Sequence, residues 1–146
     1  MSVVAEVSRT VPVAPARMYA RWADCNTHPQ WSTDLETVHL DEPLAIGARG
    51  HLKPKGGPRL PFFVSELDAD RTFADTTKLV GGRLTFRHHA EPAGNDCADV
   101  TVTVTLTGTL APLWRRILGL NNAATGVNDD LDRLVALIDS DIAADR

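Results

Sequence analysis

The chain has only two cysteines and no long apolar run, and each shortage excludes a class of protein. No stretch approaches the roughly 20 apolar residues that a membrane-spanning helix needs. Residues 1–10 alternate apolar and polar side chains and lack the apolar segment of a secretory signal peptide. Cys25 and Cys97 form neither a CxxC pair nor a zinc-binding spacing. We therefore expect a cytoplasmic protein without a membrane span.

Basic charge is also in short supply, with 15 Lys and Arg residues against 19 Asp and Glu residues and a net charge of -4. Proteins that bind nucleic acids usually present a concentrated basic face. The longest basic cluster here, Arg115–Arg116, lies in a helical pattern and is expected to be a solvated helix face. A nucleic-acid partner is therefore not expected. The 146 residues suit one domain, residues 1–146, and no repeat or composition break divides it.

The N-terminal region predicts a strand followed by two short helical segments. The strand covers Val3 to Val11, and Pro15 is suited to the first turn of a helix, where its missing N–H is tolerated. Apolar and aromatic residues then recur at helical spacing, at Met18, Tyr19 and Trp22. Residues 24–31 are expected to form a second short helix or turn.

From Thr37 to Thr107, short β-prone runs alternate with clusters of turn-forming residues, which is typical of an antiparallel meander. The clearest strand covers residues 100–107, where valine or leucine alternates with threonine at every position. Such alternation predicts one covered face and one solvated face.

The C-terminal segment changes to a helical period. An apolar stripe predicts a helix which, if continuous from about Pro112 to Ala143, would be about 45 Å long. Gly119 and Gly126 each weaken such a helix by about 1 kcal/mol relative to alanine. Residues 119–126 carry mostly small side chains. These either leave a void for a ligand or allow close backbone packing against the sheet, and the sequence leaves both interpretations open.

Four stretches carry a resemblance to a known family: APARMYARWADCNTHPQW (14–31), GARGHLKPKGGP (47–58), RTFADTTKLVGGRLTFRHH (71–89) and VTVTVTLTGTLAPLWRRILG (100–119). Together with the order of the elements, they resemble the polyketide cyclase/dehydrase branch of the START-like, birch-pollen-allergen-like SRPBCC superfamily. The resemblance implies an α+β helix-grip fold. In this fold a curved antiparallel sheet of about six or seven strands wraps around a long C-terminal helix, with two short helices after the first strand. It also implies a cavity for lipids, polyketides or similar apolar ligands, but no particular reaction.

The hairpin around Gly81-Gly82 places two polar residues on the cavity face. A two-residue turn at these glycines would set Thr77 opposite Phe86 and Asp75 opposite His88. Asp75 and His88 would then lie side by side. A carboxylate beside an imidazole can support proton transfer, anchor the polar end of a ligand, or simply hold the strands in register.

The leading hypothesis from the sequence is binding of a small apolar molecule in the grip cavity. Trp31 is expected near the cavity mouth. Around Phe62 and Phe63, apolar residues occupy both strand faces, so the sequence does not decide which of the two phenylalanines faces the cavity. The full set of candidate ligand-binding residues is Trp31, Phe62, Phe73, Asp75, Thr77, Phe86, His88, Val102, Val104, Asn121 and Ala124.

Two alternatives remain beside this hypothesis. One is a polyketide cyclase, aromatase or dehydratase in which His88 transfers a proton and Asp75 orients it; the other is an interaction module with a vestigial cavity. No metal site is expected, because neighbouring strand residues such as His88 and His89 face opposite sides. The glycine pairs lack the context of a phosphate-binding loop, so no cofactor is expected either. The oligomeric state stays open, with a homodimer as one alternative.

Overall fold

The computed structural model of the chain describes residues 2–145. Its strands are β1 (Ser2–Val11), β2 (Leu35–Leu40), β3 (Arg49–Pro54), β4 (Leu60–Asp68), β5 (Thr72–Leu79), β6 (Gly82–Pro92) and β7 (Ala98–Thr107). Its helices are α1 (Pro15–Ala23), α2 (Ala111–Ile117) and α3 (Ala123–Ala144), with the 3₁₀ helices η1 (Cys25–Gln30) and η2 (Leu120–Asn122).

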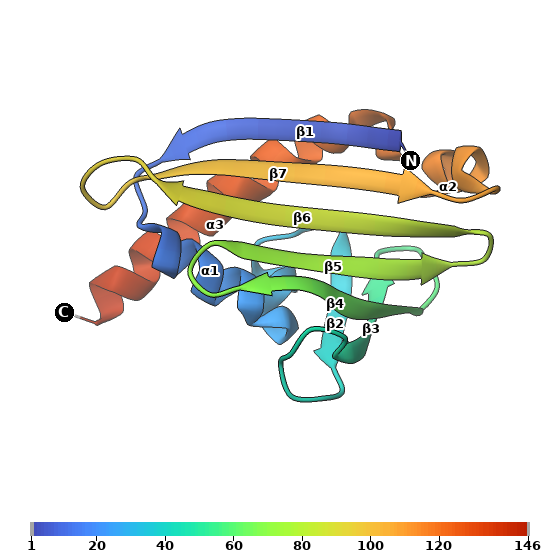
Figure 1. The fold of residues 1–146 in the computed structure, drawn as a ribbon, viewed down its shortest axis with the longest axis horizontal. Coiled ribbons are helices and arrows are strands. Elements are labelled where there is room, and N and C mark those ends of the chain that lie inside the picture. Colours follow the sequence, from blue (N-terminus) through green and yellow to red (C-terminus); the bar gives the residue numbers. More distant parts are fainter. Residues whose placement is uncertain (1, 146) are drawn as a thin grey trace.

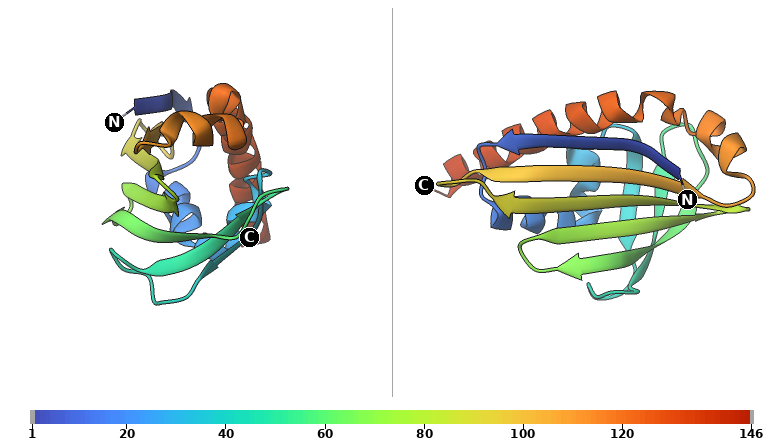
Figure 2. Two further views of the ribbon diagram at one scale, coloured as in Figure 1. Left: turned by 90° about the vertical axis from the view of Figure 1, so that its right-hand side faces the viewer. Right: turned by 45° about the horizontal axis from the view of Figure 1, so that its top comes forward.

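The strands form one antiparallel sheet in the order β1-β7-β6-β5-β4-β3-β2. Figure 1 shows α3 running obliquely behind this sheet. Seen from the end that carries α2, the sheet curves strongly and α3 lies across its open side (Figure 2). The predicted α+β helix-grip fold is therefore confirmed, with seven strands and two short helical segments after the first strand.

Strand β7 shows how the sequence pattern sets the inner face of the sheet. Val100, Val102, Val104 and Leu106 are at most 2% exposed, whereas the intervening threonines are partly exposed. Because side chains alternate between the two faces of a strand, every second residue of β7 enters the core. The predicted covered and solvated faces are confirmed.

The β5–β6 hairpin keeps the predicted faces, but the predicted register is wrong by two residues. Asp75 pairs with Phe86, and His88 pairs with Phe73. The turn is formed by Val80 and Gly81, where Gly81 has a φ of 70° that favours glycine. Gly82 belongs to the strand, where a Cβ would lie 2.9 Å from the carbonyl oxygen of Thr107 on β7. Position 82 therefore requires glycine because β6 and β7 approach closely there, and not because a turn needs it.

The first two helices close one end of the sheet. Pro15 is the first residue of α1, as predicted, and Met18 and Trp22 from this helix are fully buried. The predicted second helix is the 3₁₀ helix η1, which buries Cys25 and His28. Because a 3₁₀ helix has about three residues per turn, His28 and the following Trp31 emerge on the same side.

The predicted long C-terminal helix is confirmed as α3, but it is not continuous from Pro112, because the chain breaks between α2 and α3. Gly119 takes a φ of 65°, in the left-handed region, and this residue ends the helical path. Beyond the break the apolar stripe is confirmed, with buried residues at Val127, Leu131, Leu134 and Ile138. In α2, by contrast, no residue is buried.

Ion pairs attach α3 to the rest of the fold. Arg21 of α1 makes two hydrogen bonds to the carboxylate of Asp141, at 2.9 and 2.8 Å. Arg9 of β1 bonds to Asp132 at 2.6 Å. These contacts link α3 to α1 and to the edge strand β1.

Candidate ligand-binding cavity

A cavity of about 590 Å³ lies between the inner face of the sheet, η1 and the segment that joins α2 to α3. Its wall on the sheet side includes Phe62, Leu84, Phe86 and Val102. The residues that line it from the C-terminal segment are Ile117, Leu118, Gly119, Leu120, Asn122, Ala123, Thr125, Gly126, Val127, Asp130 and Leu131.

The small residues at the start of α3 border open space. A Cβ added to Gly126 would meet only the Asp34 carboxylate, at 3.8 Å. Between the two interpretations left open by the sequence, this geometry favours the void over close backbone packing. A cavity of this size also argues against a vestigial interior, since small-molecule sites occupy roughly 300–1,000 Å³.

Phe62 points into the cavity side of the sheet, and Phe63 points out. Phe62 is 2% exposed, and its ring lies over Gly50, where a Cβ would come within 2.8 Å of the ring atoms. The Phe63 ring lies on the outer face beneath the cations of Lys78 and Arg83, at 5.4 and 5.9 Å from its centroid. The structure thus shows that Phe62, and not Phe63, faces the cavity.

Five rings gather at the inner end of the cavity. The ring centroid of His88 lies 5.2 Å from that of Trp22, 6.1 Å from that of Trp31 and 6.2 Å from that of Phe73. His28 completes this ring cluster, at 5.0 Å from Trp31 and 5.7 Å from Phe73. Four of the rings line the cavity, and Phe73 packs behind them.

The two histidines of the ring cluster are neutral imidazoles with defined tautomers. His88 donates from Nδ1 to the Phe73 carbonyl at 3.2 Å, and His28 donates from Nε2 to the Trp22 carbonyl at 2.7 Å, because a carbonyl only accepts. Burial lowers the pKa of His28 to about 4 and that of His88 to about 3. The nearby His28 also lowers the pKa of His88. The remaining ring nitrogens, Nε2 of His88 and Nδ1 of His28, are therefore acceptors.

Asp75 lines the same cavity from β5 and is 8% exposed. Its carboxyl group makes no hydrogen bond or ion pair with any residue between 2 and 145, and burial raises its pKa to about 7. Asp75 and His88 share the inner face but are diagonal neighbours on β5 and β6, so the predicted side-by-side pair is wrong. The cause is the two-residue difference in register.

Two buried donors also lack a partner. The indole N–H groups of Trp22 and Trp31 have no acceptor among the described residues. Most buried polar groups in proteins are hydrogen-bonded, so unpaired donors beside a cavity indicate where a bound molecule could supply the missing acceptor.

The cavity lining also carries acidic groups. Asp130 of α3 accepts a hydrogen bond from Ser32 at 3.2 Å, and burial raises its pKa to about 6. Asp34 lies nearby on the loop before β2, and the exposed Lys55 lies on the loop between β3 and β4. Lys55 provides the only ammonium or guanidinium group in the lining described by the structure.

The structure brings most of the predicted site residues together. Trp31, Phe62, Asp75, Thr77, Phe86, His88 and Val102 all line the cavity. Phe73 and Val104 are fully buried behind its wall. Asn121 and Ala124 are exposed and lie outside the lining. Asn121 belongs to η2, after the break at Gly119, and Ala124 lies in the first turn of α3, so neither has the place that a continuous helix would give it.

Sequence reasoning missed Trp22 and His28 as cavity residues. The spacing of three residues between His28 and Trp31 could have indicated a shared face, had the 3₁₀ geometry of η1 been predicted.

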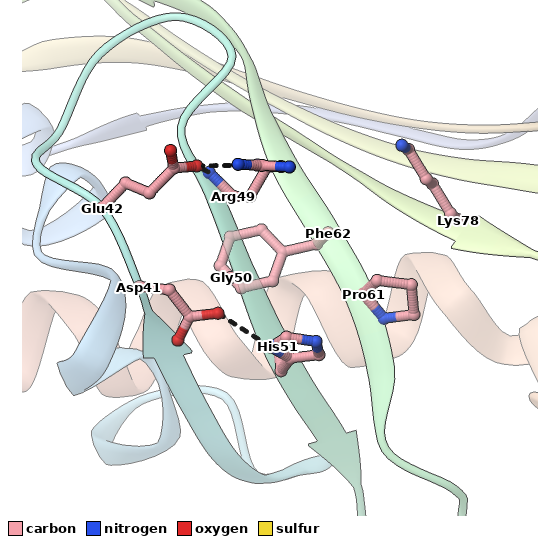
Figure 3. A pocket seen from close by; sticks show the side chains of 8 residues that line it. All are labelled: Asp41, Glu42, Arg49, Gly50, His51, Pro61, Phe62 and Lys78. Atoms are coloured by element: carbon pink, nitrogen blue, oxygen red, sulfur yellow. Dashed lines mark hydrogen bonds and ion pairs between the residues drawn. The ribbon is translucent and has the colours of Figure 1, made fainter.

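A second, smaller pocket of about 260 Å³ lies beside β3 and β4 (Figure 3). Its acidic residues already have partners: Glu42 accepts from Arg49 at 3.0 Å, and Asp41 lies 2.9 Å from His51. Because the larger cavity has a mostly apolar wall and polar groups without protein partners, we assign the candidate site to it. Within residues 2–145, no cluster of three or more His, Cys, Asp or Glu side chains could hold a metal ion.

A curved sheet gripping one long helix around a lined cavity is the architecture of the SRPBCC class, as the resemblance predicted. The chain belongs to the polyketide cyclase/dehydrase and lipid transport family, whose family model matches residues 2–139. A search of curated protein sequences finds no match. None of the helices between residues 2 and 145 has the length and apolarity that crossing a bilayer requires.

Solved structures share the fold at low sequence identity. A Nitrosomonas europaea protein has a TM-score of 0.72 and 12% identity, over 95% of this chain and 96% of that one. Norcoclaurine synthase from Thalictrum flavum, in complex with dopamine and hydroxybenzaldehyde, has a TM-score of 0.70 and 10% identity, over 94% and 86%. Ara h 8.0201 has a TM-score of 0.69 and 17% identity, over 93% of this chain and 97% of that one.

Proposed function

We propose that the protein binds one small apolar molecule in the cavity between the sheet and α3. The observation that carries this proposal is a space of about 590 Å³ between the sheet and α3, whereas protein interiors are normally close-packed. Its wall is mostly apolar and includes a few buried polar groups without protein partners, which is the usual composition of a small-molecule site. Membership of a family described by lipid transport supports the same proposal.

In this proposal the residues divide into walls and anchors. Trp31, Phe62, Phe86 and Val102 provide apolar contact, and Thr77 lies beside Phe62 on the sheet floor. Asp75 and His88 contact the polar end of the ligand. Phe73 and Val104 support the site from behind and do not touch the ligand.

Native mass spectrometry of the purified protein tests the proposal directly. We expect a bound species that denaturation releases, and its mass and fragmentation identify its chemical class. An apo mass that stays unchanged after incubation with apolar extracts would count against ligand binding.

Two neighbouring alanines offer a matched pair of variants. Ala123 lines the cavity, whereas Ala124 is exposed and does not. Ala123→Phe should fill part of the cavity and reduce the amount of bound ligand, whereas Ala124→Phe on the same helix turn should leave it unchanged. Equal retention by both variants would place the ligand elsewhere.

The environment of Asp75 favours a second candidate function, an enzyme of the cyclase or dehydratase type. A general acid or base works best with a pKa near the operating pH, and burial brings the pKa of Asp75 to about 7. His88, with a pKa of about 3, is a weaker base, so we assign proton transfer to Asp75 and not to His88. With a poly-β-ketone substrate, Asp75→Asn should then abolish turnover while substrate binding persists. Equal loss of binding and turnover would favour an anchoring role.

A further inference from the structure

The inner end of the cavity combines unpaired donors with unpaired acceptors. The donors are the indole N–H groups of Trp22 and Trp31. The acceptors are the Asp75 carboxyl oxygens and Nε2 of His88, whose Nδ1–H is occupied by the Phe73 carbonyl. Both indole rings lie against His88, with centroid distances of 5.2 and 6.1 Å. All four residues line the cavity, so its wall includes both unpaired donors and unpaired acceptors.

The ionisable groups around the cavity disfavour an anionic ligand. The lining contains three carboxyl groups, on Asp34, Asp75 and Asp130, and its single ammonium group is on the exposed Lys55. No described cation reaches the ring cluster to offset the desolvation of a ligand carboxylate. An unpaired carboxylate buried beside other acids is strongly disfavoured.

An ammonium group fits the inner end less well than a hydroxyl group. An ammonium could donate to Asp75 and His88, but it has no lone pair for the two indole donors. A carbonyl oxygen could accept from the indoles, but it could not donate to ionised Asp75 or to Nε2 of His88. A hydroxyl group does both, because it has one donor and two acceptor positions.

We propose that the cavity selects an uncharged, hydroxyl-bearing apolar molecule, which enters with its hydroxyl end toward Trp22, Trp31, Asp75 and His88, and that it rejects fatty acids and other carboxylate lipids. This inference rests on the proposed binding function and specifies its ligand class.

Four probes with similar alkyl chains test the selectivity: octan-1-ol, octan-2-one, octanoate and octylammonium. Each is titrated at neutral pH into protein freed of bound lipid, and affinity is measured by calorimetry. We expect octan-1-ol to bind most tightly and octanoate to bind at least about tenfold more weakly, because its charge is desolvated without a partner. If octanoate binds as tightly as octan-1-ol, or octylammonium binds more tightly, the proposed ligand class is wrong. Either result would still support the proposal that the cavity binds an apolar molecule. Binding by none of the four would overturn the proposed function as well.

The indole N–H signals in a ¹⁵N-resolved NMR spectrum report the hydrogen bonds themselves. The chain has three tryptophans, and Trp114 is an internal control because its indole already donates to the Val80 carbonyl at 2.7 Å. Octan-1-ol should shift the Trp22 and Trp31 signals and leave the Trp114 signal in place. Unmoved Trp22 and Trp31 signals at saturation would overturn the proposed orientation.

Variants separate the charge argument from packing. Asp75→Asn removes the buried negative charge at constant shape and should narrow the affinity ratio between octan-1-ol and octanoate. Trp31→Phe removes one donor and should weaken octan-1-ol binding several-fold, whereas Trp114→Phe should not. If Asp75→Asn leaves the affinity ratio of octan-1-ol to octanoate unchanged, the buried charge of Asp75 does not determine the selectivity. This test does not depend on Trp31→Phe, which could fail to fold.

Discussion

Replacement of Asp75 by asparagine should stabilise the protein at neutral and alkaline pH and have a smaller effect in acid. The carboxyl group is buried without a hydrogen bond or a cation, and its pKa rises from 3.8 to about 7 on folding. The folded state therefore holds a proton that the unfolded chain releases above pH 3.8. Since stability falls with pH wherever the native state binds more protons, this contribution is complete below pH 3.8 and is lost as pH rises to about 7.

The size of the effect follows from the two pKa values. Each pKa unit corresponds to about 1.4 kcal/mol, so the full loss is about 4 kcal/mol, of which about 3 kcal/mol falls between pH 5 and pH 8. His28 and His88, whose pKa values are lowered by burial, contribute in the opposite direction, since their stabilisation is lost as pH falls below 6.5. Subtracting wild type from Asp75→Asn at each pH cancels the histidine contributions.

Urea unfolding followed by tryptophan fluorescence at several pH values measures this difference. We expect the free energy of unfolding of Asp75→Asn, relative to wild type, to rise by about 3 kcal/mol from pH 5 to pH 8. Asp139→Asn, at an exposed position of α3, is the control and should give a nearly constant difference. A constant difference for Asp75→Asn as well would show that its carboxyl group is solvated or paired, and would refute the reasoning.

Three further predictions concern the helices and the cysteines. Gly119→Ala should destabilise the protein by about 1 kcal/mol, because alanine is strained at a φ of 65° although space is available; a thermal shift that is absent or positive would contradict this. Arg21→Lys should lower the free energy of unfolding by about 1 kcal/mol, because lysine cannot form the bidentate pair with Asp141. The same substitution at an exposed arginine should leave the free energy of unfolding nearly unchanged. Cys25, whose pKa is raised to about 12 mainly by burial, should resist a thiol reagent at neutral pH in the folded protein while the partly exposed Cys97 reacts; two reactive thiols would contradict the burial.

The sequence was sufficient to predict the fold because its periodicities are local and strong. The alternation of β7 and the stripe from Val127 to Ile138 each identify one buried face, and the order of elements leaves few ways to pack them. The break at Gly119 does not follow from the sequence pattern. A glycine within a helical pattern predicts a loss of about 1 kcal/mol, whereas the left-handed conformation of Gly119 ends the helical path after α2.

The site was only partly predictable, because its geometry depends on register and on contacts distant in sequence. Both glycines at residues 81 and 82 suit a turn, and only the carbonyl of Thr107, on another strand, assigns Gly82 to β6. The two-residue difference preserves the strand faces, so Asp75 and His88 still enter the cavity, but it separates them. The convergence of Trp22 on His88 joins α1 to β6 and has no signature in local periodicity.

The same carboxyl group links the stability and the ligand class of this protein. At neutral pH the buried Asp75 destabilises the empty fold, because nothing in the described chain neutralises it or donates to it. A ligand hydroxyl that donates to Asp75 stabilises the ionised form and should lower its pKa. Saturation with octan-1-ol should therefore raise the free energy of unfolding more at pH 8 than at pH 5, beyond the pH-independent gain that binding provides by mass action. Asp75→Asn should show only the pH-independent gain. If wild type also shows an equal gain at both pH values, the alcohol is bound without contact to Asp75, and the anchor lies elsewhere in the cavity.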